Sequence, residues 1–85
     1  MRYKINKGFI TQKLDGKTTI FDSENSQLYT FNHTASFIFD KIKKGLSKED
    51  LIELMVKKYK ITKVRAEKDY LDLEKELLAK KIIRR

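Results

Sequence analysis

The sequence predicts an α+β domain in which three antiparallel strands precede three helices. Two strand-like segments, 9–14 and 17–22, flank the pair Asp15-Gly16, and both positions of that pair tolerate the positive φ angles of a tight hairpin turn. A third strand-like segment, 28–31, runs without a spacer into a helical pattern. Three strands followed by three helices give a small winged-helix-like domain.

The hairpin turn sets which side chains share a face of the sheet. A two-residue turn places Ile10, Leu14 and Phe21 on one face. It places Phe9 and Ile20 on the other. A longer, bulged loop would shift these partners, and the imperfect alternation of the two segments leaves both registers open.

The corner between the third strand and the first helix fixes how the helices meet the sheet. Asn32 offers a side-chain oxygen to the free amides of a first helical turn. Apolar residues then recur at the spacing of one buried face, at Ala35, Ile38, Phe39 and Ile42. Phe37 falls outside this face. The helix is expected to run to about Lys44 and to end at Gly45, which can adopt a left-handed cap.

Two more helices follow. Ser47 begins the second helix with a start like a capping box, and Thr62 is expected to cap a third helix that ends near Lys80. The apolar face of the second helix comprises Leu51, Ile52, Leu54, Met55 and Tyr59. The predicted core comprises Phe31, Ile38, Phe39, Ile42, Leu51, Leu54, Met55 and Leu77.

The third helix carries two apolar stripes. At about 100° per residue, one stripe comprises Ala66, Tyr70, Leu73 and Leu77. The second comprises Val64, Leu71 and Leu78 and is bordered by Lys68 and Lys75. Together the stripes are wider than the roughly 100° that packing on one core requires. One stripe can serve the core while the other lines a groove; alternatively, neighbouring elements simply wrap a terminal helix.

Composition restricts the class of protein. The 85 residues suffice for one domain, over residues 1–85, with one core. A formal net charge of +8 suits an anionic partner, or serves solubility. The absence of cysteine excludes disulfides and fits a reducing cytosol. No apolar run approaches the roughly 20 residues that cross a bilayer, so we expect a cytoplasmic chain without a membrane partner.

Residues that could support catalysis are sparse. The only histidine, His33, lies at the expected start of a helix, where a surface position near the cap is the simpler interpretation. No second histidine or cysteine can complete a metal site, and no glycine-rich loop can hold a phosphate. We therefore expect no catalytic activity, no cofactor and no metal.

Several segments together resemble the PqqD-like family, the recognition elements for ribosomally made, post-translationally modified peptides. They are Ile20-Phe21-Asp22, Leu28-Tyr29-Thr30-Phe31-Asn32-His33-Thr34-Ala35, Ile38-Phe39, Gly45 and the final pair Ile82-Ile83. The resemblance covers nearly the whole chain from Gly8. It implies a winged-helix-like fold of three strands and three helices without catalytic activity.

The resemblance also implies a function and a site. Proteins of this kind bind the leader segment of a precursor peptide and present its core to a separate modifying enzyme, such as a radical enzyme, a leader protease or a cyclase. The leader adds as a strand to the edge of the third strand and packs against the third helix. Carried onto this chain, the site comprises Gln27, Leu28, Tyr29, Thr30, Phe31, Val64, Lys68, Leu71, Lys75 and Leu78.

The residues of the third strand are compatible with that role. The segment 28–31 holds no charge and no proline, so nothing on it discourages pairing with another strand. Strand addition gives affinity through the backbone and selectivity through side-chain pockets. A basic domain would attract an acidic leader, with Lys68 and Lys75 at the rim of the groove.

Two other functions share these features. A winged-helix DNA-binding protein would have the same fold and charge, but the third helix would have to enter the major groove. From 63 to 80 that helix holds five basic and five acidic residues, whereas phosphate contacts require a local excess of positive charge. We therefore expect no specific nucleic-acid partner. A scaffold domain could use the same apolar stripe for a protein partner.

Overall fold

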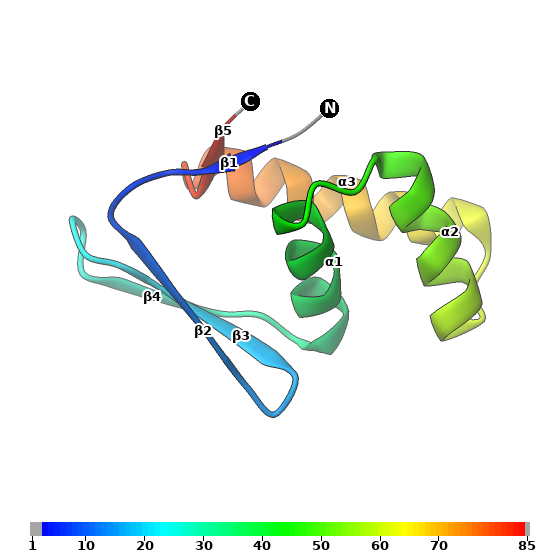
Figure 1. The fold of residues 1–85 in the computed structure, drawn as a ribbon, viewed down its shortest axis with the longest axis horizontal. Helices are drawn as coiled ribbons and strands as arrows, with labels where there is room; N and C mark the ends of the chain where they lie inside the picture. The colour runs from blue at the N-terminus through cyan, green and yellow to red at the C-terminus, as the bar shows by residue number, and fades with distance from the viewer. Residues whose placement is uncertain (1–2, 85) are drawn as a thin grey trace.

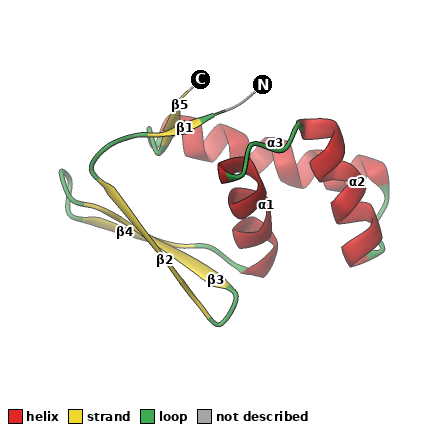
Figure 2. Cartoon of the chain, in the orientation of Figure 1, coloured by secondary structure: helices red, strands yellow, loops and turns green. Residues whose placement is uncertain are grey.

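Helices occupy one side of the molecule and a three-stranded antiparallel sheet occupies the other (Figure 2). The computed structural model describes residues 3–84. The elements are β1 (Lys4–Ile5), β2 (Phe9–Leu14), β3 (Lys17–Asp22), β4 (Gln27–Thr30), α1 (His33–Lys43), α2 (Lys48–Tyr59), α3 (Lys63–Ala79) and β5 (Ile83–Arg84). The predicted α+β class and the order of sheet and helices are confirmed.

The β2–β3 hairpin has the two-residue turn that the sequence indicates. Leu14 pairs with Lys17, and the intervening Asp15 and Gly16 have φ angles of 52° and 76°. This register turns Ile20 into the core and leaves Ile10 and Leu14 exposed on the outer face. Position 16 also has little room for a side chain, because a Cβ added to Gly16 would lie 3.0 Å from Nδ1 of His33.

A buried hydroxyl joins the sheet to α1. The Phe31 amide donates to the Thr18 carbonyl at 2.9 Å, but the Thr18 amide donates to Oγ of Ser36 at 2.7 Å instead of returning the bond. Ser36 Oγ in turn donates to the Phe31 carbonyl at 3.4 Å. Because Asn32 Oδ1 caps the helix at Ala35 N, the chain turns from strand into helix within two residues. Ser36 therefore completes the hydrogen bonds at the end of the β3–β4 ladder. Its neighbour Ala35, which was expected on the buried face of the helix, is only half-buried.

We predict that Ser36→Ala lowers the free energy of unfolding by about 1–3 kcal/mol, because it leaves the buried Thr18 amide and Phe31 carbonyl without a partner. Denaturation in urea measures the change. Ser23→Ala is the matched control, since the Ser23 hydroxyl bonds the Gly8 carbonyl at an exposed site. Equal losses in the two variants would contradict the proposed role of Ser36.

The core lies between the inner face of the sheet and the three helices. Phe31 and Phe39 meet edge to face with their ring centroids 5.7 Å apart. Seven of the eight predicted core residues are buried, but Leu54 is 39% exposed. Leu54 is rotated about 100° from Met55 in α2, away from the buried face that continues through Ile52.

Phe37 has a role that its helical position did not predict. Its ring lies edge to face with that of Tyr59 at 5.8 Å, which ties α1 to the end of α2. The ammonium groups of Lys41 and Lys58 each lie 5.3 Å from the Phe37 ring centroid. Phe37 thus belongs to a small half-buried cluster beside the core.

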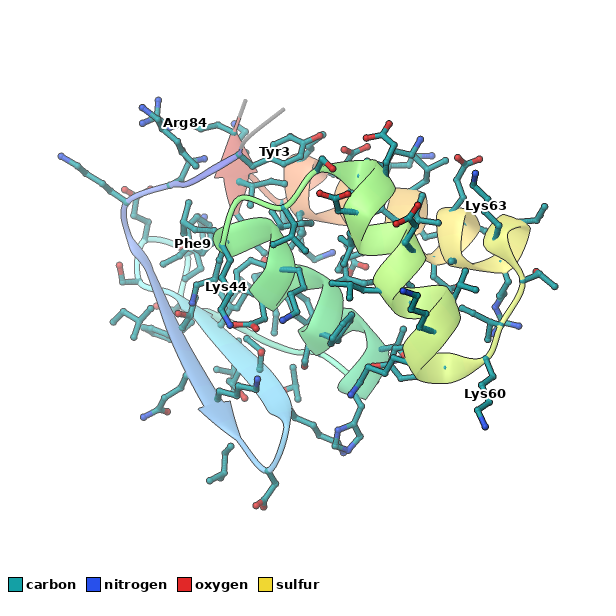
Figure 3. The ribbon with its side chains drawn as sticks, turned by 45° about the vertical axis from the view of Figure 1, so that its right-hand side comes forward. Tyr3, Phe9, Lys44, Lys60, Lys63 and Arg84 are labelled. Atoms are coloured by element: carbon teal, nitrogen blue, oxygen red, sulfur yellow. The ribbon has the colours of Figure 1, made fainter. Side chains whose placement is uncertain are left out.

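The two ends of the described chain lie side by side (Figure 1). β1 pairs with β5 in an antiparallel two-stranded sheet, and Ile83 is buried there. Tyr3 lies over α3 and its hydroxyl donates to Glu74 (Figure 3). The Tyr70 hydroxyl also donates to Glu74, at 3.3 Å; burial and then the nearby Glu74 charge raise the pKa of Tyr70. These contacts hold the chain ends against α3.

Candidate functional site

β4 is an edge strand with unpaired backbone groups. The Phe31 amide donates to the Thr18 carbonyl, and Tyr29 lies opposite Ile20 of β3, so the backbone groups of Phe31 and Tyr29 face β3. Because the groups of an antiparallel strand alternate, Leu28 and Thr30 turn their N–H and C=O groups to the other side. Among residues 3–84 no strand pairs with that side. The edge therefore offers two donors and two acceptors to an extended chain.

The side chains of β4 alternate between two environments. Tyr29 is half-buried on the inner face, where Nζ of Lys80 lies 5.4 Å from its ring centroid. Leu28 is 65% exposed on the outer face and lies opposite Phe21, which in turn lies opposite Ile10. An apolar row thus crosses the outer face of the sheet and ends at the edge of β4.

A hydrogen-bonded turn fixes the start of β4. The Asp22 carboxylate accepts from the backbone amides of Glu24 at 3.0 Å and Asn25 at 3.2 Å, and from Asn25 Nδ2 at 2.9 Å. The Asn25 side-chain bond is the main cause that lowers the pKa of Asp22, and the two backbone bonds add to it against the effect of burial. The ionised carboxylate therefore holds the turn that leads into Gln27.

We predict that the Glu24 and Asn25 amide resonances titrate together, with a midpoint below the ordinary Asp value of 3.8. Since the pKa of Asp22 is lowered in the folded chain, its contribution to stability is present above that ordinary value and is lost as the pH falls through the lowered pKa. Two-dimensional NMR across this pH range measures the midpoint. A midpoint at or above 3.8 would contradict the assigned turn.

One hollow lies where β4 passes into α1. It measures about 260 Å³ and is bordered on the β4–α1 side by residues that include Asn32 and Thr34. α3 supplies the opposite wall, with Arg65, Asp69, Asp72, Leu73 and Glu76. Three of these five are carboxylates, so this feature is called the acidic hollow below.

A second hollow lies at the other end of β4. It measures about 440 Å³ and includes Asp22, the cross-strand partner of Gln27, and Lys80, which covers Tyr29. The other lining residues are Asn6, Lys7, Phe9, Glu24, Asn25, Lys81 and Arg84. Four of the nine residues are cationic and two are anionic, so this feature is called the basic hollow.

Comparison with known proteins places the chain in a family. The family model described as coenzyme PQQ synthesis protein D (PqqD) matches residues 17–83, a span that includes β4 and α3. The chain belongs to the PqqD family. None of the curated proteins matches it.

Two solved structures share the fold of this PqqD-family chain. One is a lasso peptide synthetase B1 complexed with the leader peptide, with a TM-score of 0.92, 18% identity and full coverage of both chains. The other is TbiB1 in complex with the TbiA(beta) leader peptide, with a TM-score of 0.85 and 16% identity. That match covers 94% of this chain and 93% of TbiB1. The identification of the chain as PqqD-like is confirmed.

The PqqD-family chain brings only part of the predicted strand site to the edge. Leu28 and Thr30 present their backbones there, whereas the backbones of Gln27 and Tyr29 face β3. Phe31 is buried in the core against Phe39. Within the predicted strand, the register with β3 therefore leaves Leu28 and Thr30 as the residues whose backbone groups could bond a partner.

The predicted α3 residues do not line either hollow. Val64 is 81% exposed, Leu71 is 42% exposed, and Leu78 is half-buried against the core. Lys75 is exposed, and Lys68 pairs with Asp72 at 2.9 Å. Each charged residue of the acidic hollow immediately precedes a core residue of α3, whereas Leu71 and Leu78 immediately follow one. At about 100° per residue these two sets lie on opposite flanks of the core stripe.

The sequence also contains a signal for the flank of α3 that lines the acidic hollow. Arg65, Asp69, Asp72 and Glu76 repeat at the helical spacing of four, three and four residues, in step with the core stripe. Such a charged row is also typical of an ordinary solvated helix face, so the sequence favoured the apolar stripe as the site. Only the position of α1 against α3 shows which flank borders Asn32 and the start of α1.

The chemistry that this site offers is backbone hydrogen bonding, apolar contact and surface charge. Within residues 3–84 there is no group of three or more His, Asp or Glu side chains placed to hold a metal ion. Nor does that part of the chain include a helix with the length and hydropathy to cross a membrane.

Proposed function

We propose that this PqqD-family chain binds the leader segment of a ribosomally made precursor peptide and is not itself a catalyst. The leader adds as a strand to β4. The observation that carries this proposal is the unpaired edge, where the N–H and C=O groups of Leu28 and Thr30 face outward on a strand without charge or proline. The fold shared with two proteins solved with leader peptides supports it.

The geometry of the edge explains how such a peptide would gain affinity. Each backbone hydrogen bond contributes about 0.5–1.5 kcal/mol net, and the edge offers four groups. The outer apolar row through Ile10, Phe21 and Leu28 would give an outward-facing peptide side chain an apolar neighbour. Backbone bonds would supply affinity, while side chains on both faces would supply selectivity.

The second wall of the site is proposed to be the acidic-hollow flank of α3, beside Asn32. The alternative from the sequence is the flank that carries Val64, Lys68, Leu71, Lys75 and Leu78. Leu71→Asp and Asp72→Lys distinguish the two, because these adjacent residues lie on different flanks. Loss of leader binding with Leu71→Asp alone would favour the sequence-based assignment.

A separate modifying enzyme is the proposed second partner. Once bound, the leader would hold the following core segment close to that enzyme and raise its effective concentration. A radical enzyme, a leader protease and a cyclase are the candidate classes. Co-purification of the chain with the enzyme encoded beside it, with and without the leader, tests this partnership.

Chemical-shift mapping tests the binding mode. The probe is the leader segment of a short precursor peptide identified by sequencing the neighbouring genes, and a scrambled leader is the control. We expect the amides of Leu28 and Thr30 to shift and to become protected from hydrogen exchange. Shifts confined to the tip of the β2–β3 hairpin or to α2 would exclude the β4 edge as the site.

A further inference from the structure

The two hollows lie at opposite ends of the β4 edge. Asn32, two residues beyond β4, lines the acidic hollow. At the other end Asp22 pairs with Gln27 and also lines the basic hollow, and Lys80 reaches from that hollow to the ring of Tyr29. A peptide strand on this edge would therefore pass from one hollow to the other.

The walls of the hollows carry opposite charge. Three carboxylates and one guanidinium line the acidic hollow, and four cations and two carboxylates line the basic hollow. Lys7, Lys81 and Arg84 take part in none of the ion pairs formed within residues 3–84, and Arg84 points away from the fold (Figure 3). Of the two carboxylates there, that of Asp22 is already bonded within its own turn. The excess positive charge is therefore open to a ligand.

The carboxylates of the acidic hollow are paired only weakly. Asp72 pairs with Lys68 at 2.9 Å, Glu76 with Lys80 at 3.0 Å and Asp69 with Arg65 at 3.4 Å, all on exposed or half-exposed side chains. Such surface pairs contribute little, so a cationic side chain of a peptide can join or replace them at small cost.

The partial charges at two helix ends are opposite in sign to the side-chain charges of the hollows, but they are too small to reverse them. α1 begins at the acidic hollow and α3 ends at the basic one, and a helix end carries roughly half an elementary charge. Lys80 of the basic hollow pairs with Glu76 of the acidic hollow at 3.0 Å, so these two charges cancel. The other lining residues leave each wall an excess of one formal charge, and its sign is retained. A four-residue strand spans roughly 13 Å, more than the Debye length of about 8 Å in physiological salt. Each hollow therefore acts mainly on the nearer part of the peptide.

We infer that the segment bound at β4 carries opposite charges at its two ends. Its acidic end lies beside the basic hollow near Gln27, and its basic end lies beside the acidic hollow near Asn32. This inference rests on the proposed function and specifies the chemistry of the peptide. Because a strand can pair in either direction, the charge pattern also selects the direction in which the peptide adds.

A displayed peptide library tests the inference. Its members share an alternating Val-Thr centre, and both flanks are randomised over Asp, Lys, Ser and Gly. We expect the enriched peptides to carry acidic residues on one flank and lysines on the other, in one constant order. Exchanging the flanks should weaken binding by roughly twofold to fivefold for each charged pair, and high salt should reduce the difference.

Charge-reversal variants locate the effect. Lys7→Glu should remove the preference for acidic residues on one flank, and Asp72→Lys should remove the preference for lysine on the other. Lys57→Glu and Glu53→Lys are the matched controls, since both residues are exposed on α2 and line neither hollow. The controls change the net charge equally and should leave the pattern intact.

The outcomes separate this inference from the proposed function. Uniform enrichment of acidic residues on both flanks would overturn the inference, because the net charge of +8 alone explains it. A pattern that survives both hollow variants would also overturn it. If such peptides still shift the amides of Leu28 and Thr30, the proposed function stands. Failure to enrich any peptide that shifts those amides would contradict both.

Discussion

Phe39→Ala is expected to lower the free energy of unfolding by about 3–5 kcal/mol. Phe39 is 1% exposed and packs edge to face on Phe31, at the corner where β4 passes into α1. Its removal leaves a cavity that this corner cannot fill without moving the strand. Because small domains have a total stability of about 5–15 kcal/mol, thermal melting should shift markedly.

Leu54→Ala is the matched control for Phe39→Ala. The sequence assigns both residues to the core, but Leu54 is 39% exposed on α2 and should cost less than Phe39. Urea denaturation of the two variants gives the comparison. A loss at Leu54 equal to that at Phe39 would mean that α2 is rotated relative to the arrangement described above.

The sequence was most informative where one local rule decided the structure. Asp15-Gly16 allows a two-residue turn, and that turn alone sets which residues of β2 and β3 face the core. Asn32, Ser47 and Thr62 each cap the helix that they were expected to begin. These features depend on neighbours within three or four positions, so a single sequence contains them.

Features that depend on distant segments were harder to predict. The β1–β5 pair joins two-residue strands from the two ends of the described chain, which are too short for a local pattern to show that they pair with each other. The buried hydroxyl of Ser36 bonds Thr18, which is 18 positions earlier. Serine within a helix gives no indication of such a partner.

The candidate site also combines features that the local sequence predicts with features that depend on distant segments. An uncharged strand without proline, Leu28–Phe31, pointed to the edge, but the choice of Leu28 and Thr30 as its outward groups requires the register with β3. The flank of α3 that faces the start of α1 depends on how α1 packs, and both flanks repeat with the same period. Periodicity can identify a stripe without showing what lies opposite it.

Leu28→Pro is expected to weaken leader binding by about 10–100-fold while the fold is retained. Proline removes the outward N–H of residue 28, and its ring occupies the space that a partner carbonyl would need. The peptide carbonyl then loses its bond and, once buried, remains unpaired. The ladder with β3 keeps its bonds, because those involve the backbones of Gln27 and Tyr29. Calorimetric titration with the leader measures the loss.

Two further variants give this prediction its controls. Leu28→Val keeps the backbone donor and an apolar side chain beside Phe21, so it should bind the leader within a few-fold of the original chain. Tyr29→Pro removes an amide that faces β3 and should unfold the strand itself, which circular dichroism and melting detect. If Leu28→Pro melts normally and binds the leader as tightly as Leu28→Val, the peptide does not pair with β4. In that case the leader would have to bind elsewhere on the chain, because the variant lacks one of the two outward amides that strand addition would use.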